Sequence, residues 1–433
     1  MARHQLVAIE LARFDSGPSF RYRSGTMSQP GRSPIARGAI GPMVALALVA
    51  LVGMTPAMAA PASQEPPTSI VEPIPQVPAP PAPAAAPAVV GPLKLLEADV
   101  GTRLELRLFN PNQPDKLNDV GMQGQVQLFL SGQATRNILW QADFIGTFGR
   151  IDQSQHYDTT GSAAVLDLIA RFEFHDALNL WVGRMLVPAD RSGLSTEWSI
   201  APWLMPGQFV AGAAPAGPLQ GRYGRSDGVT LWGQLGGGTF KYYLAAFNLA
   251  DASQSPLYSC RLSLNLLNPE PGYRNASVYY GSKDVLALGA GFQHQHNGLQ
   301  EIDPATSLAA AWDDFTDLNF DLFFEKSLGP GGVLDLEGAF YKLWGHYQLE
   351  SITYFLLASY LLPIEVGAGK FQFLFRLQQG SDRVTSDTDA LTDAQLGYII
   401  DGLRTRVALD YRYSKVQGQT GNALLLGLQL MTR

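Results

Sequence analysis

The stretch KFQFLFRLQ, residues 370–378, alternates between apolar and polar side chains. The apolar parity holds Phe371, Phe373, Phe375 and Leu377. The polar parity holds Gln372, Arg376 and Gln378. Successive side chains of an extended chain point to opposite faces, so this stretch predicts a β-strand with one oily and one polar face.

The same period of two recurs along the chain, for example in TRLELRLF (102–109) and LNFDLFFE (318–325). The runs last about 8 to 12 residues, the length of a tilted strand that crosses a membrane. We therefore expect an all-β protein, a transmembrane antiparallel up-and-down β-barrel of about 16 strands. The candidate strands begin near residues 102, 121, 136, 163, 177, 226, 239, 257, 285, 316, 332, 352, 370, 392, 403 and 422.

The connections between these strands sort into two classes. If the first strand starts in the periplasm, the tight turns lie on the periplasmic side, at 132–135, 236–238, 328–332 and 401–402. The longer connections then lie outside, at 149–162, 186–225, 296–315 and 380–391. Short turns on one side and long loops on the other are typical of outer-membrane barrels. The stretch Leu267–Asp284 is the exception, and either it is an insertion or the strand count is wrong by one hairpin there.

The N-terminal part of the chain has a different composition. The apolar run MVALALVALVGM (43–54) follows Arg32 and Arg37 and leads into Ala57-Met58-Ala59, a pattern of secretory signal peptides. The run is too short for a transmembrane helix, which needs about 20 residues. We assign 1–59 to an N-terminal extension and signal peptide, with Met27 as an alternative start. Residues 60–92, rich in Pro and Ala, predict a disordered periplasmic linker, and 93–433 form the barrel.

Composition and motifs argue against several classes of function. The formal charge is −7, whereas nucleic-acid binding needs clustered Lys and Arg. Cys260 is the single cysteine, and no Cys/His spacing matches a zinc site. His294 and His296 share a strand face but lack a third ligand. The chain has no G-x-S-x-G elbow, phosphate loop or dinucleotide fingerprint, so we expect neither enzymatic activity nor a cofactor.

Residues 186–225 form the strongest functional candidate, because the segment is too long for an ordinary loop in a compact domain. It either folds into the lumen and narrows it or caps the outside of the barrel. In the first case its apolar side chains pack on the inner wall: Trp198, Trp203, Leu204, Met205 and Phe209. Its charged side chains then face solute, together with Arg184 at the end of the preceding strand: Arg191, Glu197, Arg222 and Arg225.

The polar parity of the strands predicts a lumen wall of mixed charge. Eight positions are basic: Arg103, Arg107, Arg171, Arg261, Arg376, Arg404, Arg406 and Arg412. Nine are acidic: Glu105, Asp143, Asp167, Glu173, Asp321, Glu325, Asp335, Glu337 and Asp410. Charged side chains commonly line a water-filled channel. Arg376, Arg404, Arg406 and Arg412 form the one hint of a positive strip, with cross-strand pairing to acids as the alternative.

Several segments resemble the phosphate-selective porin family of proteobacterial outer membranes. They are LNLWVGRMLVPADRSGLST, GRSDGVTLWGQLGGGTFKYYLAAFN, PLYSCRLSLNLLNPEPGYRN and KDVLALGAGFQHQ. The shared markers are a G-R-x-x-x-P exit from the fifth strand, an R-x-D-G-V start to the sixth and an L-G-x-G-x-Q strand. The resemblance implies a 16-stranded porin and a homotrimer. The ladder of Arg and Lys that serves phosphate selectivity in that family has no counterpart in the balanced wall.

These observations predict a passive porin of the Gram-negative outer membrane. Small hydrophilic solutes or ions would diffuse through a water-filled barrel constricted by residues 186–225. The expected surroundings are outer-membrane lipid and lipopolysaccharide, reached through the barrel assembly machinery. The alternatives are a closed structural or adhesion barrel, a membrane-embedded enzyme and a secreted soluble β-protein.

Overall fold

The computed structural model describes most of the expected barrel. The described residues are 96–109, 121–151, 157–158, 162–206, 224–248, 255–302, 309–345, 352–381, 388–416 and 419–432. The predicted signal peptide (1–59) and linker (60–92) lie outside these residues, and so do Phe209 and Arg222.

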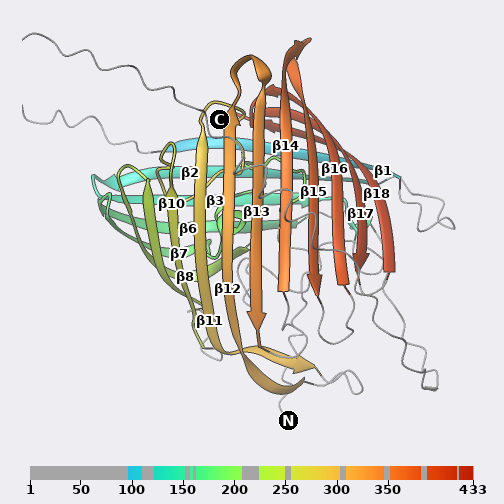
Figure 1. The fold of residues 1–433 in the computed structure, drawn as a ribbon. Helices are drawn as coiled ribbons and strands as arrows, with labels where there is room; N and C mark the ends of the chain where they lie inside the picture. The colour runs from blue at the N-terminus through green and yellow to red at the C-terminus, as the bar shows by residue number, and fades with distance from the viewer. Residues whose placement is uncertain are drawn as a thin grey trace, which may run out of the picture. The chain divides into compact units, whose positions relative to one another are not determined.

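Sixteen antiparallel strands close into one barrel, in which each strand pairs with its neighbours along the chain (Figure 1). The first strand closes the barrel by pairing with the last, for example Leu104 with Leu428. The prediction of an all-β barrel of about 16 strands is therefore confirmed. The strands are β1 (Glu97–Phe109), β2 (Gly121–Thr135), β3 (Ile138–Phe148), β6 (Ser162–His175), β7 (Leu178–Leu186), β8 (Arg225–Leu235), β9 (Phe240–Phe247), β10 (Leu257–Asn265), β11 (Val285–Ile302), β12 (Ala309–Ser327), β13 (Val333–Trp344), β14 (Ile352–Val366), β15 (Gly369–Ser381), β16 (Thr388–Asp401), β17 (Thr405–Val416) and β18 (Gln419–Met431).

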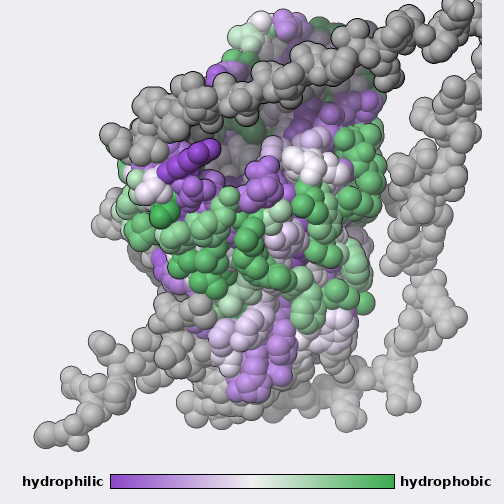
Figure 2. All heavy atoms as spheres, turned by 90° about the vertical axis from the view of Figure 1, so that its left-hand side faces the viewer, coloured by the Kyte–Doolittle hydropathy of each residue, from purple (hydrophilic) through white to green (hydrophobic). Residues whose placement is uncertain are grey.

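The two faces of the strands differ as their alternation predicts. On β15, Phe373 and Phe375 are 54% and 53% exposed, whereas Gln372 and Arg376 on either side of them are buried. Large apolar side chains point outward on the other strands too, and on the face drawn in Figure 2 they gather in a broad patch across the middle of the barrel. The outer surface is therefore suited to hydrocarbon, and the polar groups point into the lumen.

The two ends of the barrel carry different connections. Short turns at 136–137, 176–177, 236–239, 328–332, 367–368 and 402–404 lie at one end, which we call the short-turn end. Longer segments mostly join the strands at the other end, which we call the loop end. The connection 266–284 lies at the short-turn end although it is long. It is thus a true insertion, and the strand count is correct.

Minor elements lie outside the barrel wall. They are the paired two-residue strands β4 (Arg150–Ile151) and β5 (Tyr157–Asp158), the helix α2 (Arg191–Leu194) and the 3-10 turn η3 (Gly329–Gly331). Among the described residues no helix is long and apolar enough to cross a membrane.

Candidate functional site: two segments inside the lumen

The first described residues after β7, 187–206, fold into the barrel; we call them the β7–β8 segment. Asp190 caps the short helix α2 by accepting a hydrogen bond from Gly193 N at 2.6 Å, and Tyr341 of β13 donates a second hydrogen bond to the same carboxylate. Burial raises the pKa of Asp190 despite the Tyr341 hydrogen bond. The segment is buried along nearly its whole length. It therefore follows the lumen alternative of the two predicted for this connection.

Two tryptophans anchor the β7–β8 segment on the far wall. The Trp198 indole N–H donates to Gln127 of β2 at 2.6 Å, and that of Trp203 donates to Glu105 of β1 at 2.7 Å. Each ring lies over an inward-facing glycine. A Cβ added to Gly101 would lie 2.8 Å from the Trp198 ring, and one added to Gly427 would lie 2.5 Å from the Trp203 ring. Only glycine lets the segment approach the wall so closely.

The insertion at the short-turn end, residues 266–284, also enters the lumen; we call it the β10–β11 segment. Its backbone meets the first segment: Asn275 N donates to Leu194 O at 3.1 Å, and Ser277 N donates to Ser199 O at 2.8 Å. Ile200 and Ser277 form an isolated parallel bridge. Two segments from opposite ends of the barrel therefore contact each other inside it.

A buried ion pair joins the two segments. Both guanidinium Nη atoms of Arg191 bind the Glu270 carboxylate, at 2.9 and 2.6 Å, and the two side chains are 1% and 2% exposed. Burial alone would raise the pKa of Glu270, but Arg191 and a hydrogen bond from Tyr279 outweigh it and lower the pKa to about 2. Removing one partner of such a pair leaves an uncompensated buried charge.

Aromatic rings hold the β10–β11 segment against β7, β8 and β9. Tyr273 stacks on Trp181 with a centroid distance of 4.4 Å and meets Trp232 and Tyr243 edge-on at 5.6 and 5.3 Å. All four rings are buried. The Tyr273 hydroxyl donates to Leu186 O at 2.8 Å, which gives its polar end a partner.

The predicted positive strip holds the β7–β8 segment in place. Arg406 donates to the carbonyls of Ile200 and Ala201 at 2.6 and 2.9 Å, and Arg376 donates to Leu204 O at 2.9 Å. Arg412 is 12% exposed and pairs with Asp393 at 3.1 Å and with Asp410 at 2.9 Å. A non-helical segment inside a barrel leaves backbone carbonyls without partners, and these guanidinium groups supply them. Most of the hydrogen-bonding capacity of these guanidinium groups is therefore used by other groups of the protein.

Two predicted lumen residues lie elsewhere. Arg184 has the same parity on β7 as the exposed Leu178 and Val182, so it faces outward, where it pairs with Asp227 of β8 at 2.7 Å. The prediction that Arg184 lines the pore is wrong, and the parity of its own strand would have shown it. Arg404 is 58% exposed in the turn between β16 and β17, where it pairs with Asp401, so that prediction is wrong too. The other charged positions predicted for the wall face inward.

A cluster of charges between β2, β3 and β6 includes a residue that the sequence reasoning missed. Arg225 is buried and pairs with Asp167 at 3.1 Å. Arg274 of the β10–β11 segment reaches the same carboxylate at 2.8 Å and Asp143 at 3.4 Å. Glu197 accepts a hydrogen bond from Gln125 Nε2 at 3.2 Å. The stretch that contains Arg274 is unusually long for its end of the barrel, but nothing in its sequence indicates that it turns into the lumen.

The inner wall has two regions of different exposure. Inward side chains in the middle of β10 to β17 are buried, for example Arg261, Asn319 and Gln372 at 1%, 0% and 1%; we call this region the filled wall. Inward side chains of β1, β2, β3 and β6 are mostly partly exposed, with Arg171 at 23% and Glu173 at 29%; we call this region the open wall.

The open wall is interrupted at mid-height. Buried side chains there come from the strands and from the β7–β8 segment, and Arg274 contacts one of them, Asp143. We call this group the neck: Gln127, Asp143, Glu197, Trp198 and Arg274. Water-accessible wall lies on both sides of it, with Gln125 on the loop side and Phe129 on the other.

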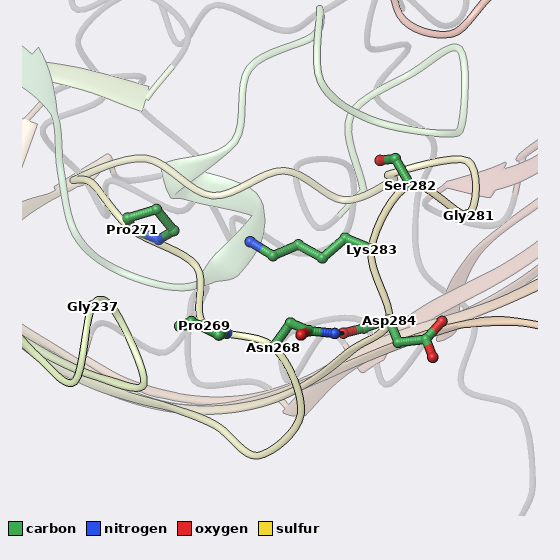
Figure 3. A pocket seen from close by; sticks show the side chains of 8 residues that line it. All are labelled: Gly237, Asn268, Pro269, Pro271, Gly281, Ser282, Lys283 and Asp284. Carbon is green, nitrogen blue, oxygen red and sulfur yellow. Dashed lines mark hydrogen bonds between the residues drawn. The ribbon is translucent and has the colours of Figure 1, made fainter.

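A pocket of about 530 Å³ opens at the short-turn end (Figure 3). Its lining comes from the turn between β8 and β9 and from both ends of the β10–β11 segment. Lys283 extends across it toward Pro271, while Asp284 is held by Lys326 and by Ser327 N. Lys283 Nζ lies 5.3 Å from the Tyr279 ring centroid. None of the predicted site residues lines this pocket.

His294 and His296 lie on the outward parity of β11. His294 shares a hydrogen bond with Thr316 at 3.0 Å, and His296 lies 2.7 Å from Asp314. Within the described part of the chain no group of His, Cys, Asp and Glu is placed to hold a metal ion.

Comparison with known proteins gives structural likeness alone. No family model matches the chain, and no curated protein matches it. OprB of Pseudomonas putida superposes with a TM-score of 0.54 at 10% identity, covering 78% of this chain and 93% of that one. OmpF of Salmonella typhi, solved with daunomycin, gives 0.50 at 11% identity, with coverage of 78% and 97%. A mutant of Rh. blastica porin gives 0.45 at 12% identity, with coverage of 78% and 100%.

The chain therefore has the antiparallel barrel fold of these two outer-membrane proteins, OprB and OmpF. At these identities the likeness extends to the barrel architecture and not to any solute.

Proposed function

We propose that the protein is a passive outer-membrane channel for small hydrophilic solutes or ions, constricted at the neck by the β7–β8 segment. The observation that carries this proposal is the open wall. Side chains on both sides of the neck remain partly exposed to water inside a barrel whose opposite wall is buried. Solutes would follow β1, β2, β3 and β6 rather than the barrel axis. We propose a transport role without catalysis.

The test is conductance of the purified protein in a planar bilayer. We expect discrete steps that are small for a 16-stranded barrel, because the filled wall removes most of the cross-section. The folded state is checked separately by gel migration, since a folded barrel runs faster before boiling. A folded protein that never conducts would contradict the proposal.

The second candidate is a closed structural barrel. It is favoured by the buried contacts between the two lumen segments, which leave the filled wall no free surface. The two candidates differ in whether solutes can cross the membrane, because a closed barrel admits none. Swelling of proteoliposomes in small sugars or amino acids separates them, and no swelling would favour the closed barrel.

The resemblance to phosphate-selective porins and the homotrimer remain predictions. If phosphate is the solute, millimolar phosphate should reduce the chloride current, and an equal concentration of sulfate should reduce it less. If the protein forms a homotrimer in a lipopolysaccharide-containing membrane, the protein extracted from that membrane should run at three times the monomer mass on native gels. A current that phosphate does not reduce would contradict phosphate selectivity but not the channel function.

A further inference from the structure

Arg274 is the charged side chain that the β10–β11 segment brings to the neck. Its guanidinium Nη2 lies 2.8 Å from Asp167 and 3.4 Å from Asp143, on the inward faces of β6 and β3. The two carboxylates are 0% and 1% exposed, whereas Arg274 is 30% exposed. Arg274 is therefore the partly exposed member of this group of three charges, and both acids are buried beneath it.

The other charges of this cluster are hidden from that side. Arg225 is 1% exposed and paired with Asp167, and Glu197 is 6% exposed and bonded to Gln125. Arg171, further along the open wall, is paired with Glu173 at 2.5 Å. Among the described residues of the neck, Arg274 thus presents the accessible charge.

The arginines of the predicted positive strip do not present an accessible charge at the neck. Arg376 and Arg406 are buried and bonded to backbone carbonyls of the β7–β8 segment. Arg412 is shared between two carboxylates, as Arg274 is, but it is only 12% exposed and lies outside the neck. These three arginines are therefore less accessible to a passing ion than Arg274.

We propose that Arg274 sets the charge preference of the neck, because permeating ions meet its side chain and this favours small anions over cations of equal size. This inference rests on the proposed channel function. A unit charge about 4 Å from a passing ion changes the energy of that ion by roughly 1 kcal/mol in water, which is about fivefold in its permeability. The change has opposite signs for an anion and a cation, so the ratio of their permeabilities changes by roughly 25-fold. Without Arg274, Arg225 is left with the three acids Asp143, Asp167 and Glu197, and the neck becomes more negative by one charge.

The experiment compares reversal potentials in a KCl gradient across a planar bilayer. Arg274→Gln should shift the chloride-to-potassium permeability ratio toward potassium by roughly 25-fold, because chloride loses a favourable interaction and potassium loses an unfavourable one. Arg404→Gln is the matched control, since it makes the same chemical change in an exposed turn outside the lumen, and it should leave the ratio unchanged. Asp143→Asn should shift the ratio the other way, toward chloride, because it frees part of the Arg274 charge.

The possible outcomes distinguish a failure of the role of Arg274 from a failure of the proposed channel function. Arg274→Gln channels with the wild-type ratio would overturn the role of Arg274 while leaving the channel intact. If Arg274→Gln does not fold, the test rests on Asp143→Asn. In that variant an unchanged chloride-to-potassium permeability ratio, or a shift toward potassium, would overturn the proposal. A folded wild-type protein without conductance contradicts the channel itself.

Discussion

The filled wall and the open wall belong to one sheet with one alternation pattern, yet they do different things. On the filled wall, inward Arg376 and Arg406 are buried against the β7–β8 segment. On the open wall, inward Arg171 and Glu173 remain partly exposed. Polar parity thus identifies which side chains enter the lumen, while the two lumen segments decide which of them meet water. A charged residue on the inner face of a barrel is not by itself pore-lining.

The strongest way to break this contrast is to remove the β10–β11 segment. Replacing residues 268–282 by a tight turn should expose the part of the filled wall that this segment covers and raise single-channel conductance severalfold. Replacing the turn residues 328–332 by another tight turn is the control and should leave conductance near wild type. A folded deletion variant with unchanged conductance would show that the passage does not border this segment.

Breaking the ion pair between the segments should cost stability more than any exposed pair. Arg191→Ala leaves Glu270 buried without its partner, which typically costs about 3 to 5 kcal/mol. Arg404→Ala removes an exposed pair and should cost less than about 1 kcal/mol. Denaturant unfolding in detergent measures both, and equal midpoints would contradict the burial contrast.

Acid should weaken the same pair in a defined window. The folded state lowers the pKa of Glu270 from 4.5 to about 2, so the folded state binds fewer protons than the unfolded state in that range. Its contribution, on the order of 3 kcal/mol, is complete above about pH 4.5 and is lost as the pH falls toward 2. Unfolding of wild type and Glu270→Gln at pH 7, 4 and 2 tests this, because the difference between them should shrink at pH 2.

The smallest effect should come from a single methyl group on the inner wall. Gly427→Ala would place a Cβ 2.5 Å from the Trp203 ring and push the β7–β8 segment off its anchor, at about 1 to 3 kcal/mol. Gly397→Ala adds the same group where the nearest atom is 3.5 Å away and should change little. Similar unfolding midpoints for the two variants would mean that Trp203 can move without cost.

Much of the barrel could be predicted from the sequence because strand alternation is a local property. Each run such as KFQFLFRLQ reports its own two faces, and the inward charges followed from parity. Arg404 failed because it lies in a turn, where parity has no meaning. Arg184 failed because it lies on the outward parity of β7, with Leu178 and Val182.

The contents of the lumen were decided by the tertiary structure. Arg191 and Glu270 are 79 residues apart, and Arg406 and Ile200 are 206 apart. No periodicity links such residues, since they meet only after the sheet closes and both segments turn inward. The sequence by itself determined a barrel, its two faces and the unusual length of two connections. The positions of those connections inside the lumen decide which part of the wall stays open. They depended on closure of the barrel, because only closure brings β7 and β10 opposite β1, β15 and β17.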